Sequence, residues 1–203
     1  MKKILAYLLP LVVAGLFILY PLNPSPLKIR FYFDDYNGED CLLYYATATS
    51  PQLEEGKCLK ADYNAETRVA TFTLDSHIVK DLTTLRLDFS PTSQLFSIYD
   101  ISVSSAGVVK HRFHPCDFFA EENVAVVNDI DGMSYATALA KVFFQTGVSD
   151  PYVLFSGNLM HSILRCSSQY RLSRLLVCLL IFAGFLIWKK KLLVHENPRE
   201  VSI

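Results

Sequence analysis

Two carboxylates and a carboxamide lie within one short stretch of this sequence, Asn128-Asp129-Ile130-Asp131-Gly132. Hard oxygen ligands at alternate positions can converge on Ca²⁺ when a glycine lets the chain bend sharply. The glutamate that completes a helix–loop–helix calcium site is missing downstream, and an Asx turn explains the same residues. The pattern therefore leaves two interpretations: a structural calcium ion held by Asp129 and Asp131, or a turn that needs no cofactor.

Other side chains with catalytic or metal-binding chemistry are spaced less suitably. Asp34-Asp35 and Glu39-Asp40 could supply two carboxylates, but neighbours in one turn do not span the cleft that glycoside hydrolysis uses. His111, His114 and Cys116 offer zinc ligands, although on a strand the two histidines would point to opposite faces. No nucleophile, zinc-protease or phosphate-loop motif occurs. We expect a protein without enzymatic activity, and an unrecognised carboxylate pair is the enzymatic alternative.

Tyrosine is the residue type best suited to bind a ligand here. Rings that are exposed together on one sheet can stack against sugar rings, and the phenol adds a hydrogen-bonding group. We expect glycan contacts from Tyr32, Tyr99 and Tyr152. The alternative is that about half of the strand tyrosines belong to the core or to its border, as judged from the usual burial of this amphipathic residue.

The cysteines permit a disulfide on the oxidising side of a membrane. Cys41 and Cys58 bracket a predicted hairpin, and a bridge between them would stabilise the fold by roughly 3 kcal/mol. Cys116 and Cys166 could also pair, although their spacing does not favour it. The total of five cysteines argues against a complete disulfide scheme.

Two apolar stretches, one near each end of the sequence, predict membrane anchors. Residues 4–22 follow Lys2 and Lys3, and residues 172–188 precede three consecutive lysines at 189–191. Cytoplasmic flanks are enriched in Lys and Arg, so we expect both termini in the cytoplasm and the intervening segment outside the plasma membrane. The alternatives are a cleaved signal peptide for the first stretch and a helix packed on the domain for the second.

Charge is divided unevenly between the middle and the ends of the chain. Residues 21–173 carry 12 Lys and Arg against 18 Asp and Glu, a net charge of −6, whereas the remaining residues carry 7 against 2, a net charge of +5. Nucleic-acid binding requires a positive footprint for the phosphates, and the middle segment has the opposite sign. Basic ends suit an anionic inner leaflet. We therefore exclude nucleic acid as a partner.

The middle segment shows the period-2 alternation of β-strands, separated by turn-forming groups. In residues 96–103 the apolar phase slips from Phe96 and Ile98 to Ile101 and Val103, which predicts a β-bulge near Tyr99-Asp100. Short strands at this spacing are typical of an antiparallel sandwich. The predicted strands are residues 27–33, 41–47, 69–74, 84–89, 96–103, 108–113, 124–128, 139–145 and 152–155.

Three short motifs carry a resemblance to a known class of protein. They are Leu85-Arg86-Leu87-Asp88-Phe89-Ser90-Pro91, residues 98–103, and Ser149-Asp150-Pro151-Tyr152-Val153-Leu154-Phe155. This pattern resembles the extracytoplasmic β-sandwich of bacterial cell-envelope membrane proteins of the glycosyltransferase type, over about half of the middle segment. The resemblance implies an accessory sandwich with a jelly-roll-like topology and without the many-span catalytic region of those proteins.

The sequence therefore predicts a mainly β protein: an antiparallel, jelly-roll-like β-sandwich ectodomain flanked by two transmembrane helices. We expect it to act as a binding or accessory module for a cell-envelope protein or glycan. The alternatives are an enzyme of envelope polysaccharide metabolism and a scaffold subunit for a multispan membrane protein. The expected divisions are a cytoplasmic start at 1–3, a span at 4–22, the sandwich at 27–158, a linker or amphipathic helix at 159–171, a span at 172–188 and a cytoplasmic tail at 189–203.

Overall fold

The computed structural model describes residues 25–37, 40–105 and 109–196. The predicted first span at residues 4–22 lies outside this part of the chain. By its internal contacts the chain divides into two units, of which residues 24–170 form one. This unit, called the β-domain below, holds every strand found in the described residues.

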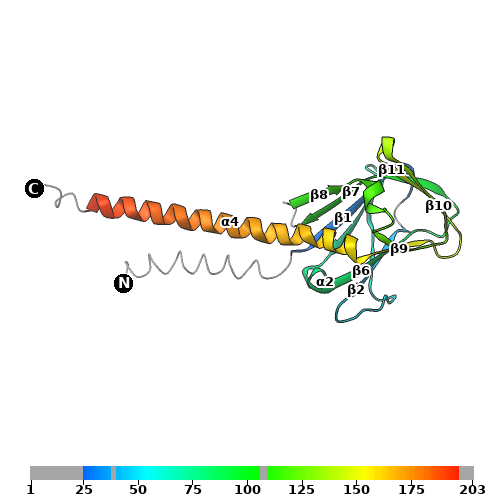
Figure 1. Cartoon of the computed structure of the whole chain (residues 1–203), viewed down its shortest axis with the longest axis horizontal. Coiled ribbons are helices and arrows are strands. Elements are labelled where there is room, and N and C mark those ends of the chain that lie inside the picture. The colour runs from blue at the N-terminus through cyan, green and yellow to red at the C-terminus, as the bar shows by residue number, and fades with distance from the viewer. Residues whose placement is uncertain (1–24, 38–39, 106–108, 197–203) are drawn as a thin grey trace, which may run out of the picture. The chain divides into compact units, whose positions relative to one another are not determined.

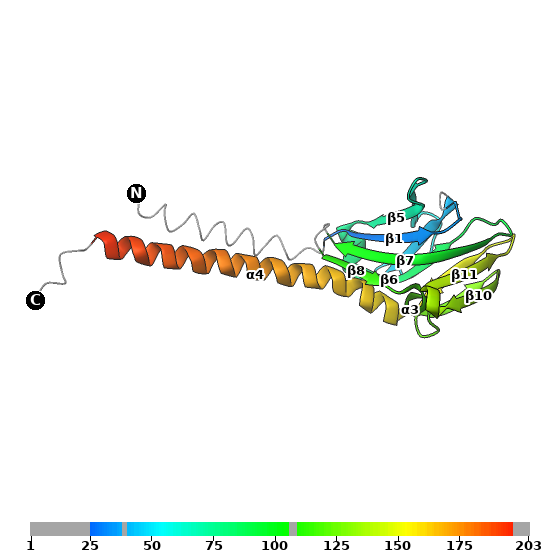
Figure 2. The same ribbon diagram turned by 90° about the horizontal axis from the view of Figure 1, so that it is seen from above.

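The β-domain is built from two antiparallel sheets (Figure 1). The first sheet, sheet A, follows the strand order β10-β11-β7-β1-β5-β4, and β8 also pairs with β7. Figure 2 shows β1 and β7 running side by side through the middle of this sheet. Its strands are β1 (Leu27–Phe33), β4 (Asp62–Asn64), β5 (Val69–Leu74), β7 (Leu95–Ser105), β8 (Val109–Phe113), β10 (Ile130–Ala136) and β11 (Lys141–Thr146).

The second sheet, sheet B, follows the order β3-β2-β6-β12-β9. Its strands are β2 (Leu42–Thr47), β3 (Cys58–Lys60), β6 (Leu82–Asp88), β9 (Val124–Asn128) and β12 (Tyr152–Phe155). Short helices connect some of the strands: α2 (Ser76–Asp81), α3 (Pro115–Phe118) and the 3-10 helix η3 (Thr137–Leu139). The mainly β, two-sheet antiparallel fold predicted from the sequence is therefore confirmed.

One buried apolar cluster joins the two sheets. Phe31 and Phe72 enter it from sheet A, and Leu43, Leu87 and Val153 enter it from sheet B. Each of these side chains is at most 1% exposed. The alternation that predicted the strands thus sends one face of each sheet inward, as a β-sandwich requires. The opposite faces are free to carry polar side chains.

The predicted bulge in β7 is confirmed by the register between β1 and β7. Tyr32 pairs with Asp100, but its neighbour Phe33 pairs with Ile98, so Tyr99 is the additional residue. The bulge allows both halves of β7 to keep their apolar side chains in the core. Its first half pairs with β11 and its second half with β8, on the edge opposite to β1.

All nine predicted strands correspond to strands of the structure, with differences of one or two residues at their ends. The expected strand at residues 139–145 begins only at Lys141, because Leu139 ends η3 and Ala140 adopts a left-handed conformation with φ 55°. Three strands were not predicted. β3 and β4 have three residues each, too few to show alternation, and β10 was interpreted as part of a turn.

Helix α4 runs from Gly157 to Glu196. Its first turns belong to the β-domain, where Leu159, Ile163 and Cys166 are buried on one face. Residues 159–171, for which the sequence left a linker or an amphipathic helix open, thus lie within a helix. Later residues of α4 expose large apolar side chains, among them Leu176, Leu180 and Ile187 at 61%, 64% and 62%. Within residues 25–196, apart from the undescribed gaps, no helix meets the length and hydropathy needed to cross a membrane.

Candidate functional site

Asp129, the first of the two predicted calcium ligands, lies where the chain crosses from β9 in sheet B to β10 in sheet A. It adopts a left-handed conformation with φ 50°. Its Oδ2 accepts hydrogen bonds from the backbone N–H groups of Ser149 at 2.6 Å and Asp150 at 3.0 Å. A Cβ at Gly147 would collide with this carboxylate, so the glycine is required by packing. Asp129 therefore organises the loop before β12.

Asp131, the second predicted ligand, is an exposed residue of β10. The described part of the chain contains no group of three or more His, Cys, Asp or Glu side chains arranged to hold a metal ion. The turn interpretation of this motif accounts for the contacts of Asp129, and a calcium ion remains a prediction.

The predicted disulfide between Cys41 and Cys58 is wrong, because both residues are free thiols. The β2–β3 register pairs Cys58 with Tyr44, whereas the Cys41 carbonyl accepts the N–H of Ala61. Three residues of extended strand, about 10 Å, therefore separate the two positions, beyond the reach of a bridge. Burial raises the pKa of the Cys41 thiol to about 12, which keeps it protonated and unreactive.

The three tyrosines predicted to contact glycan lie on two different sheets. Tyr32 on β1 and Tyr99 at the β7 bulge are neighbours on the outer face of sheet A, with ring centroids 6.0 Å apart. The bulge is what directs Tyr99 outward beside Tyr32. Tyr152 belongs to β12 in sheet B, so it cannot act together with the other two.

Tyr152 is instead part of a closed cluster on the outer face of sheet B. The Arg86 guanidinium lies 4.5 Å from the ring centroids of both Tyr44 and Tyr152. It also donates two hydrogen bonds to Asp88, at 2.8 and 2.6 Å. Asp88 is only 9% exposed, and burial raises its pKa to about 6 against the opposing effect of Arg86. These four residues, the Arg86 cluster, satisfy one another and leave little for a ligand.

Two hollows of the β-domain share lining residues from β4. One, of about 530 Å³, is lined by Asp35, Lys60 and Arg68 among others. The other, of about 460 Å³, is lined by Arg30, Tyr32 and Asn64 among others. Asp62 and Tyr63 line both hollows. We call the residues around these two hollows the β4 surface, defined by Arg30, Tyr32, Asp35, Lys60, Asp62, Tyr63, Asn64 and Arg68.

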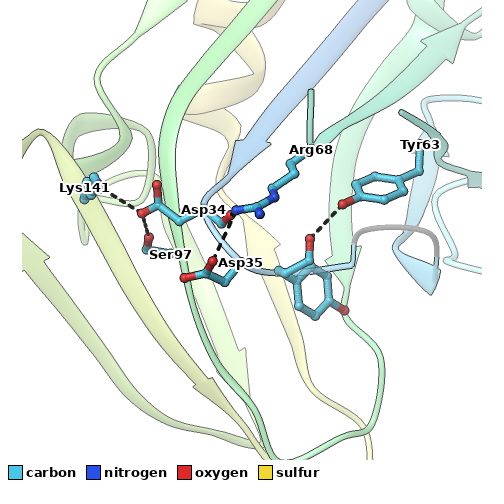
Figure 3. Close-up of polar contacts among 7 residues, drawn as sticks. Asp34, Asp35, Tyr63, Arg68, Ser97 and Lys141 are labelled. Carbon is cyan, nitrogen blue, oxygen red and sulfur yellow. Dashed lines mark hydrogen bonds and ion pairs between the residues drawn. The ribbon is translucent and has the colours of Figure 1, made fainter. Parts of the chain in front are cut away.

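Side-chain hydrogen bonds hold the loop after β1, which forms one wall of the β4 surface (Figure 3). Lys141 Nζ lies 2.7 Å from the Asp34 carboxylate, which also accepts a hydrogen bond from Ser97. Burial opposes ionisation of Asp34, but the bonds from Lys141 and Ser97 outweigh it and lower the pKa of this carboxyl. The Tyr63 hydroxyl donates to the Tyr36 carbonyl at 3.0 Å. The wall is therefore fixed before any ligand arrives.

Arg68 occupies a backbone conformation that normally favours glycine. It ends the turn between β4 and β5 with φ 53°, where an L residue costs roughly 1–2 kcal/mol. Its side chain donates to the Asp34 carbonyl and lies 3.2 Å from Asp35. An outlier held by specific contacts at the rim of a hollow is a reason to expect function there.

The carboxylates considered for glycoside hydrolysis do not form a free pair. Figure 3 shows Asp34 directed towards Lys141 and Ser97, and Asp35 towards Arg68. Glu39 lies outside the described residues. The β4 surface offers aromatic rings for stacking and planar polar groups for hydrogen bonding, and both kinds of group are suited to binding a ligand. Of the nearby residues, the sequence indicated Tyr32 and Tyr99 but not Asp62, Tyr63 or Arg68, because β4 was not predicted.

Comparison with protein-family models, with curated proteins and with solved structures finds no match to this chain. The resemblance to cell-envelope sandwich domains thus stays a prediction.

Proposed function

We propose that this chain is a membrane-anchored binding module whose extracytoplasmic β-domain recognises a cell-envelope glycan at the β4 surface. The observation that supports it most is the meeting of two hollows at Asp62 and Tyr63, beside the paired rings of Tyr32 and Tyr99. Aromatic rings bind the apolar faces of sugars. Asp and Asn side chains can accept hydrogen bonds from the neighbouring sugar hydroxyls, and Asn and Arg side chains can donate hydrogen bonds to them. No enzymatic step is part of the proposal.

The exposed apolar side chains of α4 support the membrane anchor. Seven large apolar residues between 176 and 187 are each at least 39% exposed, and burying such a surface away from water is favourable. The lysines at 189–191 would then lie on the cytoplasmic side, as they would on the inner flank of a span. Protease shaving of intact cells tests this topology: the β-domain should be digested, and its protection would contradict an extracytoplasmic position.

We also propose that the β-domain has a jelly-roll-like topology. The chain passes repeatedly between the sheets: β1 in A, β2 and β3 in B, β4 and β5 in A, and β6 in B. Such alternation between two packed sheets is typical of sandwiches with Greek-key connections. It agrees with the resemblance to envelope sandwich domains, from which the glycan class of ligand is proposed.

Glycan binding is tested with the full chain in maltoside micelles on an array of cell-envelope oligosaccharides. We expect Tyr32→Ala and Tyr99→Ala each to weaken binding about tenfold, which corresponds to the loss of one stacked ring. Tyr152→Ala is the matched control, because it removes the same side chain from sheet B. Equal weakening by all three substitutions, or none by the first two, would contradict the proposed surface.

A protein partner is a second candidate, which edge strand β9 favours. Among the described strands β9 pairs only with β12, and it presents the uncharged sequence Val-Ala-Val-Val-Asn with Val126 at 43% and Val127 at 39% exposed. Such an edge can add a partner strand. Acidic residues flank it: Glu121 and Glu122 before it, and Asp129 after it. A second copy would bring acid against acid, so an extended segment with basic ends fits better.

This candidate is tested with a synthetic Val/Thr peptide that carries lysines at both ends. We expect binding that is lost on Val126→Pro, which removes an N–H from the strand, and that is absent for a peptide with glutamates at its ends. Equal binding of the two peptides would show that charge does not select the partner.

A further inference from the structure

The outer face of sheet A carries basic side chains along β1 and β8. Figure 2 shows β5, β1, β7 and β8 lying side by side in this sheet. Ile29 and Phe31 of β1 point into the core, because each is 1% exposed. The residues that alternate with them, Lys28, Arg30 and Tyr32, therefore belong to the outer face. This strand thus presents two cations and one aromatic ring away from the core.

Arg30 lies in a row of residues that crosses the outer face from strand to strand. Its register partners are Thr71 on β5 and Ser102 on β7, and Ser102 in turn pairs with Arg112 on β8. Thr71 also pairs with Asp62 on β4. Neighbouring strands are about 4.8 Å apart, so Asp62 and Arg112 each lie about 10 Å from Arg30, on opposite sides. The row therefore has an acid at the β4 end and cations on β1 and β8.

Arg30 is the partly buried cation of this row. Its Nη1 donates a hydrogen bond to the Ser104 hydroxyl at 3.2 Å, and Ser104 is a neutral partner. Within the part of the chain that the structure describes, Arg30 forms no ion pair with a carboxylate. A guanidinium that is partly removed from water is usually paired with an acid, because its charge is costly to desolvate. The surroundings of Arg30 therefore suit an anionic partner.

The other two cations of the outer face are more exposed than Arg30. The Arg112 side chain is 68% exposed and already lies 3.4 Å from the carboxylate of Asp100. Lys28, two residues before Arg30 on β1, is also exposed. Solvated side chains such as these need no ligand, but Lys28 adds positive potential beside Arg30. Arg112 is thus a cation of the same type as Arg30 whose charge is already paired.

Arg30 and Tyr32 line the same hollow of the β4 surface. Both side chains lie over β7, where the Tyr32 hydroxyl is 3.5 Å from that of Ser102 and Arg30 bonds to Ser104. These two serines are only 0% and 4% exposed, although they belong to the outer face. Positions two apart on one strand are about 7 Å apart. A sugar ring stacked on Tyr32 would therefore carry a substituent within reach of the Arg30 guanidinium.

We propose that the glycan bound at the β4 surface is acidic, and that Arg30 binds its acid group, a carboxylate or a phosphate. This inference rests on the proposed function and names the class of glycan. One N–H group of Arg30 bonds to Ser104, so the other N–H groups of the planar guanidinium remain for the oxygens of the anion. Two parallel hydrogen bonds of this kind are among the strongest that a side chain makes.

Negative charge elsewhere in the β-domain does not oppose a single acid group at Arg30. Exposed charges are screened beyond about 8 Å at physiological ionic strength. Lys28 lies about 7 Å from Arg30 along β1, whereas Asp62 lies about 10 Å away across the strands. Asp100 on β7 is already paired with Arg112. The acid group would therefore meet a positive local potential, and Asp62 would accept hydrogen bonds from hydroxyls of a neighbouring sugar.

The test uses the array of envelope oligosaccharides with the full chain in maltoside micelles. Each oligosaccharide is offered untreated, after methyl esterification of its carboxylates and after removal of its phosphates, so the two sources of the acid group are separated. We expect one of the two treatments to weaken binding of the wild type at least about tenfold. Binding of the untreated glycan should also weaken as the salt concentration rises, whereas binding of the treated glycan should not.

Variants of the two arginines locate the effect. Arg30→Gln should bind treated and untreated glycans within about twofold of each other, and Arg30→Lys should keep part of the preference because it keeps the charge. Arg112→Gln is the matched control, since it removes the same charge from the same row, and it should keep the full preference. Lys28→Gln gives an independent variant if Arg30→Gln fails to fold, and should weaken binding of the untreated glycan about threefold.

The outcomes separate this inference from the proposed function. Equal binding of treated and untreated glycans by the wild type, with Tyr32→Ala still weakening both, overturns the acidic class and leaves the β4 surface as a glycan site. Equal effects of Arg30→Gln and Arg112→Gln overturn the assignment of the acid group to Arg30. Binding of no oligosaccharide in any form, or binding that Tyr32→Ala does not change, overturns the proposed function together with this inference.

Discussion

The outer faces of the two sheets carry the same residue types but use them differently. On sheet B, Tyr44, Arg86, Asp88 and Tyr152 contact one another, and Asp88 is nearly inaccessible. On sheet A, Tyr32 and Arg30 line a hollow together with residues of β4. Polar and aromatic groups that satisfy each other stabilise a fold, whereas those that line a hollow are available to a ligand. The composition of a face therefore does not reveal its role, but its contacts do.

The largest effect should come from breaking the Arg86 cluster. Arg86→Ala leaves the Asp88 carboxylate buried without its partner, which typically costs about 3–5 kcal/mol. Urea unfolding followed by circular dichroism measures the change. Arg30→Ala is the control on sheet A, where the lost bond is a single one to Ser104 at 3.2 Å, and should cost about 1 kcal/mol. Similar costs for the two variants would remove the contrast between the faces.

The contributions of Asp88 and Asp34 to the free energy of unfolding should also change with pH in opposite directions. The pKa of Asp88 is raised in the folded protein to about 6 from 3.8, so its contribution to stability is fully present below pH 3.8 and is lost as the pH rises through 6. The free energy of unfolding of the wild type minus that of Asp88→Asn should fall by up to about 3 kcal/mol over this window. Thermal unfolding at pH 4, 5, 6 and 7 gives the comparison.

Asp34, which fixes the wall of the β4 surface, should behave in the opposite way. Its folded pKa is lowered, so its contribution is present above 3.8 and is lost as the pH falls through the folded value. The difference between the wild type and Asp34→Asn should therefore grow with pH in the acidic range. If the wild-type minus variant free energy of unfolding changed with pH in the same direction for Asp34→Asn and Asp88→Asn, the environments of the two carboxylates would be alike.

Changing the polar rim of the β4 surface should weaken glycan binding without lowering the free energy of unfolding of the β-domain. Asp62 lines both hollows and is exposed. Asp62→Ala removes the carboxylate that accepts hydrogen bonds from sugar hydroxyls, so it should weaken glycan binding about tenfold. It should change the free energy of unfolding by less than about 0.5 kcal/mol. Isothermal titration and urea unfolding give both values. Glu66→Ala, in the nearby turn, is the matched control for removing an exposed acid.

The smallest expected effect concerns the backbone of Arg68. Arg68→Gly and Arg68→Ala remove the same contacts, but only glycine adopts φ 53° without cost, so the glycine variant should be more stable by about 1 kcal/mol. Both should bind glycan more weakly than the wild type. Equal stability of the two variants would mean that the turn relaxes, and the strain argument for this rim would fail.

Much of the fold could be predicted because apolar alternation is a local property of a strand. The phase slip between Ile98 and Ile101 even located the bulge at Tyr99. The sites were harder, because they depend on register and on which sheet a strand joins. Tyr152 could not be separated from Tyr32 without knowing that β12 lies in the other sheet. The Cys41–Cys58 bridge failed for the same reason, since the β2–β3 register displaces the two thiols.

The β4 surface itself was hidden by the shortness of its central strand. Asp62–Asn64 is too brief for alternation to be recognised, and Arg68 stands at a turn position where glycine would have signalled the hairpin. The Asn64 side chain accepts a hydrogen bond from the N–H of Thr67 at 2.9 Å. Asparagine favours turns through such bonds, so Asn64 was the local signal for the turn between β4 and β5.

Hydrogen–deuterium exchange of the full chain, with and without a bound envelope oligosaccharide, tests the central claim most directly. If the β4 surface is the binding site, amides of β4, of the turn to Arg68 and of residues 34–37 should become protected, while those of β6 and β12 around the Arg86 cluster should not change. Protection confined to β6 and β12, with no change at β4, would contradict the account.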